Sequence, residues 1–198
     1  GGGIECSNGS SPSIIDCMII GNTASEYGGG INCYLDCAPL IERCAFIGNS
    51  ATLAGGGISC DQSAPRILGC MIQGNDSALG GGVYSLRSAD TEIGGSSICG
   101  NTTDQVNGAF EDAGDNCILE ICGTDLDDNG VPDACDPDCD GDGEPDAWEI
   151  SSGQAADCND NLVPDACEID AGSVEDCNGN GIPDGCDVAS GAEDDAND

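Results

Sequence analysis

The chain opens with two versions of one stretch, GGGIECSNGSSPSIIDCMIIGNTASEY (residues 1–27) and GGGINCYLDCAPLIERCAFIGNSATLA (28–54). Two further versions follow, GGGISCDQSAPRILGCMIQGNDSAL (55–79) and GGGVYSLRSADTEIGGSSICGNTT (80–103), so the repeats start every 25 to 27 residues. Apolar residues return at the same places in short β-prone runs, and no stretch shows a helical apolar period. Because so short a unit cannot bury its own apolar face, it has to stack on its neighbours.

The repeat predicts a mainly β fold, with a right-handed parallel β-helix (solenoid) of about four coils over residues 1–103. Two apolar columns are expected along it, Ile4, Ile31, Ile58 and Val83 in one, and Ile19, Phe46, Ile72 and Ile98 in the other. A third column is polar and consists of Asn22, Asn49, Asn75 and Asn101. Stacked amides can hydrogen-bond along such a column, and a row of ligand-binding amides is the alternative. The Gly triplets are expected at turns or close contacts.

From Asp125 onward a twelve-residue motif is written four times. The copies are DLDDNGVPDACD (loop 1, 125–136), DCDGDGEPDAWE (loop 2, 138–149), DCNDNLVPDACE (loop 3, 157–168) and DCNGNGIPDGCD (loop 4, 176–187). Each has Asp or Asn at positions 1, 3 and 5, Asp at position 9, and Asp or Glu at position 12. This is the side-chain ligand pattern of an EF-hand-type loop, in which position 7 adds a backbone carbonyl. We therefore expect Ca²⁺ as the cofactor.

The expected ligands follow from positions 1, 3, 5, 7, 9 and 12 of each loop. They are Asp125, Asp127, Asn129, Val131, Asp133 and Asp136 in loop 1; Asp138, Asp140, Asp142, Glu144, Asp146 and Glu149 in loop 2; Asp157, Asn159, Asn161, Val163, Asp165 and Glu168 in loop 3; and Asp176, Asn178, Asn180, Ile182, Asp184 and Asp187 in loop 4. Loop 3 carries Leu162 at position 6, where Gly normally supplies the sharp turn, so this site is expected to be weaker or distorted.

The last loop starts are 19 residues apart, which predicts a fifth copy that begins with Asp195 and Asn197. The chain also opens within a repeat, and we expect it to be a piece of a longer polypeptide. Residues 125–198 should form a calcium-loop array with little regular secondary structure, in which each loop is followed by one or two helical turns that end at Gly153, Gly172 or Gly191. Residues 104–124 are expected to be a cap or linker between the two arrays.

The charge balance fits a cation-binding array. The chain has 38 acidic and three basic residues and a formal net charge of −35, and 28 of the acidic residues lie from Glu111 onward. Without cations this half would repel itself. A solvated acidic tail is the usual meaning of such a run, but here the acids recur at ligand spacing instead of in blocks. The balance also argues against binding to nucleic acid and to anionic membranes, and we expect no membrane insertion.

Sixteen cysteines without any histidine predict disulfides and an oxidising compartment. Zinc is disfavoured because the chain has no CxxC motif and hard carboxylates dominate. Coils 1 to 3 each have cysteine at the same two places, and coil 4 has Ser85 and Ser96 there instead, which favours bonds within a coil. The expected pairs are Cys6–Cys17, Cys33–Cys44, Cys60–Cys70, Cys158–Cys167 and Cys177–Cys186, and Cys135 could pair with Cys139. The partners of Cys37, Cys99, Cys117 and Cys122 are left open.

No catalytic residues are expected. The solenoid half has no Lys or His, its three Arg (Arg43, Arg66 and Arg87) fall at different coil positions, and no column gathers carboxylates. Lyase, hydrolase and nucleophilic-triad chemistry therefore lack their usual groups. Sequons at Asn8, Asn75 and Asn101 are compatible with glycosylation and with chance alike.

Two stretches resemble known families. FIGN at 46–49 and GGGI at 28–31 and 55–58 resemble the FxxN and GGA[ILV] repeats of polymorphic outer membrane proteins, over about residues 1–103, although FxxN is literal only in coil 2. DGEPD at 142–146 and GIPD at 181–184 resemble thrombospondin type 3 repeats, over about residues 125–198. The second resemblance implies an extracellular, disulfide-linked, calcium-dependent array. Together they imply a secreted or cell-surface bacterial protein.

These observations predict a calcium-binding extracellular structural or adhesive protein, as a filament or cell-surface component. Its expected partners are calcium ions and either a second copy, joined end to end, or surface glycans. The alternative is a carbohydrate-acting β-helix, a lyase or hydrolase, with a calcium-binding anchoring module.

Overall fold

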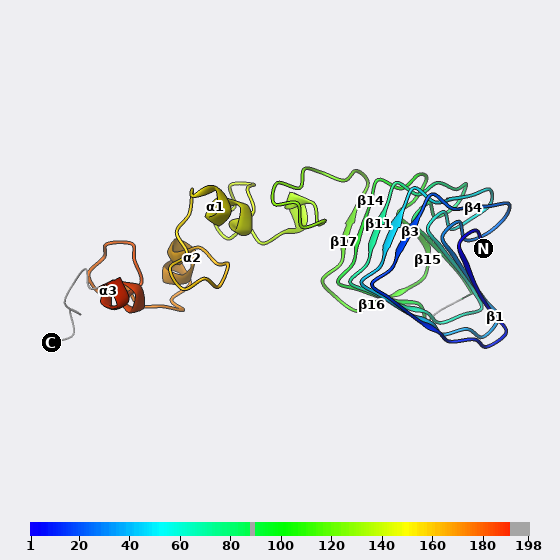
Figure 1. Cartoon of the computed structure of the whole chain (residues 1–198), viewed down its shortest axis with the longest axis horizontal. Coiled ribbons are helices and arrows are strands. Elements are labelled where there is room, and N and C mark those ends of the chain that lie inside the picture. The colour runs from blue at the N-terminus through cyan, green and yellow to red at the C-terminus, as the bar shows by residue number, and fades with distance from the viewer. Residues whose placement is uncertain (88–89, 191–198) are drawn as a thin grey trace. The chain divides into compact units, whose positions relative to one another are not determined.

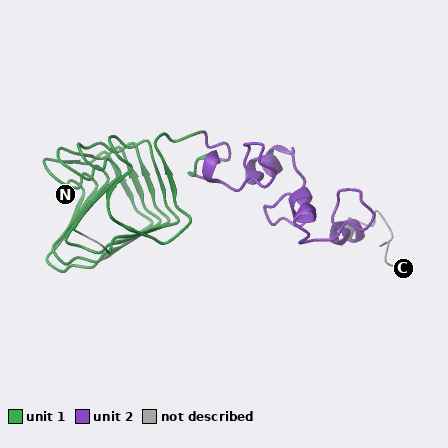
Figure 2. Ribbon diagram, turned by 180° about the vertical axis from the view of Figure 1, so that it is seen from behind, with its two compact units in different colours: residues 1–123, 130–132 green, residues 124–129, 133–198 purple. Residues whose placement is uncertain are grey.

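The structure is a computed structural model that describes residues 1–87 and 90–190. It contains two compact units (Figure 2): Gly1–Gly123 with Gly130–Pro132, called the solenoid below, and Thr124–Asn129 with the chain from Asp133 onward, called the array. The expected fifth loop, with Asp195 and Asn197, and the expected helix end at Gly191 lie outside the described residues. Among the described helices, none is both long and apolar enough to cross a membrane.

The solenoid is a parallel β-solenoid, as predicted, and consists of stacked coils (Figure 1). Its first sheet contains β1 (Ile4–Ser7), β5 (Ile31–Tyr34), β9 (Ile58–Asp61), β12 (Val83–Leu86) and β15 (Val106–Gly108). The second contains β2 (Ser13–Ile15), β6 (Leu40–Glu42), β10 (Arg66–Leu68), β13 (Glu92–Gly94) and β16 (Glu111–Asp112). The third contains β3 (Met18–Ile20), β7 (Ala45–Ile47), β11 (Met71–Gln73), β14 (Ser97–Cys99) and β17 (Cys117–Leu119). A two-stranded sheet pairs β4 (Thr23–Ala24) with β8 (Ser50–Ala51).

Neighbouring coils pair in register, so equivalent residues stack on one another. Ile31 faces Ile58, and Ile58 faces Val83. The predicted apolar columns are confirmed as the core. Ile31, Ile58 and Val83 of the first column are fully buried, and so are Phe46 and Ile72 of the second. Because alternate residues of a strand point to opposite faces, each coil places one or two apolar side chains inside per strand.

The asparagine column is confirmed as a ladder of hydrogen bonds. The Nδ2 atoms of Asn22, Asn49 and Asn75 each donate to the Oδ1 atom of the next asparagine, over 3.0, 3.0 and 2.9 Å. The last member, Asn101, donates to Oε1 of Gln105 over 2.9 Å. Because each Oδ1 also accepts the backbone N–H of the asparagine below, the amides satisfy the buried turn in every coil.

The glycine triplets lie where two coils approach most closely. A Cβ atom at Gly56 would lie 2.5 Å from the carbonyl oxygen of Gly81, and one at Gly29 would lie 2.4 Å from that of Gly56. Both contacts are with backbone, which cannot move aside. Close packing, and not phosphate binding, therefore explains these glycines.

The solenoid continues beyond the expected four coils. Residues 104–124, predicted as a cap or linker, contain β15, β16 and β17, which extend all three sheets by a fifth, shorter coil. Val106 faces Val83 and packs against the core, whereas Ile118, which faces Ile98, is exposed, so only the first core column continues. The repeat was not visible in the sequence because this coil has no glycine triplet. Its strands can still pair with those of coil 4, because strand pairing depends on backbone groups that every residue carries.

The expected disulfides within coils are wrong. In the described solenoid, Cys6, Cys17, Cys33, Cys44, Cys60 and Cys70 are thiols. Cys6, Cys33 and Cys60 stack in register across the first sheet, where a hydrogen bond with Cys33 and, next to it, burial raise the pKa of Cys6. Equivalent residues of adjacent strands are only about 4.8 Å apart, whereas the second cysteine of each coil lies outside the first sheet, in the turn between the second and third sheets. Each thiol therefore meets the next coil, and their joint loss in coil 4 does not indicate a bond.

The array has little regular structure, as predicted. Each loop ends in a short helix, namely the 3₁₀ helix η1 (Asp133–Cys135), α1 (Asp146–Ser152), α2 (Asp165–Asp170) and α3 (Asp184–Ser190). Pro145 and Pro164 precede α1 and α2 as N-caps, and α1 ends at Gly153, which has a left-handed backbone with φ +80°. The prolines therefore precede α1 and α2, and Gly153 ends α1, as expected, whereas the C-cap of α2 is Ala171, one residue before Gly172.

Candidate metal centre

The position-1 carboxylate is the hub around which three of the loops fold. Asp138 accepts the N–H of Gly143 over 2.9 Å, Asp157 accepts that of Leu162 over 2.8 Å, and Asp176 accepts that of Gly181 over 2.9 Å. These position-6 amides, with others of the same loops, stabilise the charged form of the hub. The hydrogen bond from Gly143 is the main reason why the pKa of Asp138 lies below its usual range.

Position 6 needs a left-handed backbone in every loop. The φ angle is +89° at Gly130, +95° at Gly143 and +83° at Gly181, and Leu162 adopts the same region at +66°. Leu162 makes the same hydrogen bond to position 1 as the glycines of loops 2 and 4, so loop 3 keeps the shape of its neighbours. The expected distortion is therefore not seen, and a weaker site 3 stays a prediction.

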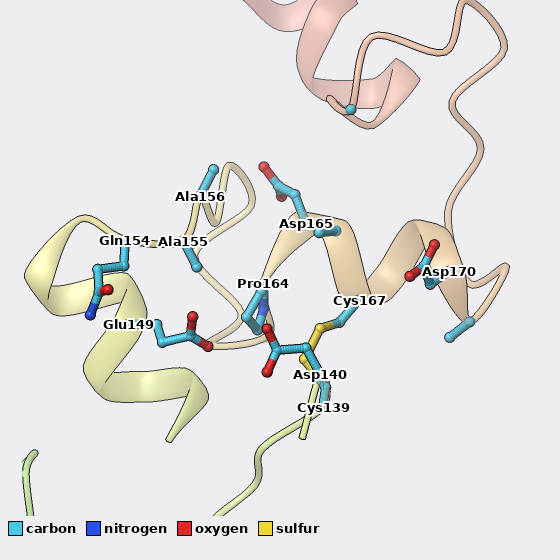
Figure 3. A pocket seen from close by; sticks show the side chains of 13 residues that line it. Cys139, Asp140, Glu149, Gln154, Ala155, Ala156, Pro164, Asp165, Cys167 and Asp170 are labelled. Carbon is cyan, nitrogen blue, oxygen red and sulfur yellow. A yellow bond between two sulfur atoms is a disulfide. The ribbon is translucent and has the colours of Figure 1, made fainter. Parts of the chain in front are cut away.

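Loop 2 brings the most carboxylates together. One oxygen from each of Asp138, Asp140 and Asp142 lies within 4.8 Å of the others. Glu149, at position 12, is only 9 % exposed, and its side chain points toward Asp140 across a pocket of about 570 Å³ (Figure 3). Burial and the nearby charges of Asp140 and Asp142 raise the pKa of Glu149. Positions 1, 3 and 5 of loop 2 therefore converge, as the ligand pattern predicts, and position 12 lies near positions 3 and 5.

Loop 1 shows the same convergence at Asp136. Burial is the main cause that raises the pKa of Asp136, and the negative charges of Asp127 and Asp125 raise it further. Among the described residues, the buried Oδ2 atom of Asp136 has no hydrogen-bond partner. A buried carboxylate oxygen without a donor is costly, and a bound cation would satisfy it.

Loops 3 and 4 hold position 12 differently. Asn159 and Asn161 donate from their Nδ2 atoms to the two carboxylate oxygens of Glu168, over 3.0 and 2.9 Å. In loop 4, Asn178 and Asn180 donate in the same way to Oδ2 of Asp187, over 3.0 and 2.7 Å. Positions 3, 5 and 12 are thus brought together in these loops too, through side-chain amides.

At position 9 one carboxylate oxygen is used within the loop, and cation binding by position 9 stays a prediction. The Oδ1 atoms of Asp133, Asp146, Asp165 and Asp184 accept the backbone N–H of position 2 in their own loops, over 2.8, 3.0, 3.0 and 2.8 Å. Each of these residues is also the first residue of its helix. The carboxylate therefore ties the start of the loop to the start of the helix, where its charge is favourable. The Pro-Asp pair at positions 8 and 9 was the sequence signal for this structural role.

Position 7 is held by the side chain of position 5. Glu144 N–H donates to Asp142 Oδ1, and the N–H groups of Val163 and Ile182 donate to Asn161 and Asn180, each over 2.8 Å. These bonds fix the backbone at position 7, whose carbonyl is the expected ligand. That the carbonyls of positions 7 bind a cation stays a prediction.

The disulfides of the array join successive loops, so the expected pairs within loops are wrong. Cys139 bonds Cys167 and Cys158 bonds Cys186, each over a separation of 28 residues. Position 2 of one loop is thereby bonded to position 11 of the next. Because Cys139 bonds Cys167, the expected Cys135–Cys139 pair is also wrong. Cys135 is itself disulfide-bonded.

The side-chain directions explain this pairing. Positions 1 and 3 face the loop, so position 2 between them faces outward. Positions 9 and 12 of the helix face the loop, so position 11 turns away. In the solenoid, Cys99 bonds Cys122, two of the cysteines whose partners the sequence left open.

No family model, no characterised protein and no solved structure matches this chain. Both family likenesses therefore stay resemblances, and the argument for function rests on the site itself. The donors around positions 1, 3, 5 and 12 are carboxylate and amide oxygens. Hard oxygen donors in this number suit Ca²⁺, and the buried Oδ2 atom of Asp136 and the buried residue Glu149 are places where the residues present fit a cation.

Proposed function

We propose that the array binds Ca²⁺ through its twelve-residue loops and that the protein is an extracellular structural or adhesive component. The observation that carries the proposal is loop 2, where Asp138, Asp140 and Asp142 converge and the side chain of the buried residue Glu149 points toward Asp140. When bound, Ca²⁺ would supply the positive charge that lets these carboxylates lie together. Positions 1, 3, 5 and 12 of each loop would hold it.

The disulfides and the solenoid support the extracellular and non-enzymatic parts of the proposal. Cys139–Cys167 and Cys158–Cys186 favour an oxidising compartment, in which disulfides persist.

Each arginine of the solenoid is used between coils. Arg66 pairs with Glu92 over 2.7 Å, and Arg87 with Asp61 over 2.9 Å. Arg43 pairs with Asp16 over 2.8 Å. The basic groups that a polysaccharide lyase would need are thus engaged in surface ion pairs, which supports a structural role over carbohydrate chemistry.

Calorimetry on the full chain tests calcium binding. We expect at least two Ca²⁺ ions per chain, and fewer than two would refute the proposal. Asp138→Asn should reduce calcium binding because it weakens the hub of loop 2. Asp160→Asn makes the same chemical change at position 4 of loop 3, outside the ligand pattern, and should bind as the parent chain does. Equal losses in both variants would mean that only total charge matters.

We propose that the solenoid binds a second copy of itself, end to end. Parallel backbone pairing joins the equivalent strands of successive coils, and the same pairing can join an unpaired end strand of a solenoid to another chain. Electron microscopy and light scattering of the full chain would detect end-to-end filaments. A monodisperse monomer at high concentration in calcium would contradict this part of the proposal.

A further inference from the structure

The four loops are of two kinds. Loop 2 has carboxylates at all of positions 1, 3, 5 and 12. Loops 3 and 4 have carboxylates only at positions 1 and 12, with Asn at positions 3 and 5. Loop 1 lies between them, with Asn only at position 5. The two kinds should differ in what holds them together when no cation is bound.

In loops 3 and 4 the asparagine amides take the place of a cation. The Nδ2 atoms of Asn159 and Asn161 donate to both oxygens of Glu168, and those of Asn178 and Asn180 donate to Asp187. Hydrogen bonds to a charged acceptor are among the stronger ones in proteins. These loops therefore close on themselves, and a cation would have to displace the amides before it could bind the same carboxylates.

Loop 2 has no side-chain amide that hydrogen-bonds to its position 12. Glu149 is nine-tenths buried, and among the described residues no donor hydrogen-bonds to its carboxylate. The charges nearest to it are those of Asp140, Asp142, Asp146 and Glu144, all negative. Desolvation and like charges both disfavour this arrangement. The unpartnered carboxylate of the buried residue Glu149 points toward Asp140, at position 3 of the cluster (Figure 3), which identifies loop 2 as the loop that most needs a cation.

On the basis of the calcium-binding function proposed above, we propose that loop 2 is the calcium-dependent joint of the array. It binds calcium most tightly because it has the most ligand charge and no side-chain amide bound to position 12 that a cation would have to displace. Without calcium it is the loop that loses its order. Loops 3 and 4 bind more weakly and stay closed when empty, because the asparagine amides hold position 12 in place.

The only tryptophan of the chain reports on this loop directly. Trp148 occupies position 11 of loop 2, next to Glu149 in α1. A calcium titration of the full chain, started in chelator and followed by Trp148 fluorescence, therefore records loop 2, while calorimetry records all loops. We expect the Trp148 signal to reach its midpoint at free calcium roughly tenfold lower than the weaker calorimetric events.

Exchanging the two kinds of loop provides the decisive variants. The double change Asp140→Asn with Asp142→Asn gives loop 2 the amides of loop 4. We expect it to raise the Trp148 midpoint roughly tenfold or more and to make the Trp148 spectrum in chelator resemble that in calcium. The matched change in loop 3, Asn159→Asp with Asn161→Asp, should leave the Trp148 midpoint unchanged and add a tight calorimetric event.

The outcomes separate this inference from the function on which it rests. If calorimetry detects no calcium binding, the proposed function is refuted, and this inference with it. If calcium binds but the Trp148 signal changes last, together with all other events, or not at all, only the inference is overturned. The same holds if the Asp140→Asn, Asp142→Asn variant titrates like the parent chain. An early Trp148 midpoint that the double variant abolishes supports it.

Discussion

Replacing Asn75 by alanine tests whether the asparagine column holds the solenoid together. The Asn75 side chain is fully buried and makes four hydrogen bonds. Its Nδ2 atom donates to the carbonyl of Phe46 and to Oδ1 of Asn101, each over 2.9 Å. Its Oδ1 atom accepts the backbone N–H and the Nδ2 of Asn49, over 2.8 and 3.0 Å.

The alanine variant should lose a large part of the stability of the solenoid. Two of the four lost partners are buried backbone groups, the N–H of Asn49 and the carbonyl of Phe46, and neither regains water. A stranded buried group costs about 1–3 kcal/mol, so Asn75→Ala should lower the free energy of unfolding by about 4 kcal/mol. Domains of this kind are typically stable by only about 5–15 kcal/mol.

Asn22→Ala is the matched control, because Asn22 stands at the end of the same column. Its side chain makes one hydrogen bond, from Nδ2 to Oδ1 of Asn49 over 3.0 Å, so the loss should be about 1 kcal/mol or less. Urea unfolding in calcium would be followed by the β-sheet circular dichroism of the solenoid, with Trp148 fluorescence as the internal standard for the array. Small and equal losses in both variants would refute the ladder and favour the alternative, a row of ligand-binding amides.

Three further predictions concern the rest of the chain. In excess chelator the array should become sensitive to protease, with the first cuts near loop 2, while the solenoid stays resistant, because the array has few apolar side chains to offset chain entropy; equal resistance of both units would contradict this. Gly56→Ala should destabilise the solenoid by about 2–3 kcal/mol through backbone overlap, whereas Gly74→Ala, where a Cβ meets nothing within 4 Å, should cost about 1 kcal/mol for its positive φ alone; equal urea midpoints would argue against close coil packing. Peptide mapping without reduction should recover Cys158–Cys186, and a Cys158–Cys167 peptide would show that the loops are cross-linked internally.

The sequence by itself was sufficient to predict the order of the solenoid and the array along the chain and the stacked residue columns of the solenoid. In-register parallel pairing places each residue on its equivalent in the next coil, so a spacing of 25 to 27 residues already specifies that Ile31 meets Ile58 and that Asn49 meets Asn75. The loop pattern is equally local. Positions 1, 3, 5 and 12 converge within twelve residues, and the Pro before position 9 and the Gly after the helix bound α1 without help from the rest of the fold.

Only the tertiary structure decided which equivalent groups bond to one another. Spacing shows that Cys139, Cys158 and Cys167 occupy positions 2 and 11, but the direction of each side chain determines that the bonds run between loops. Position 9 has a ligand's residue type, yet its carboxylate is used on the backbone of position 2, because the helix begins there. The fifth coil carries no repeat signal at all, since strands pair through backbone groups that leave no mark in the sequence.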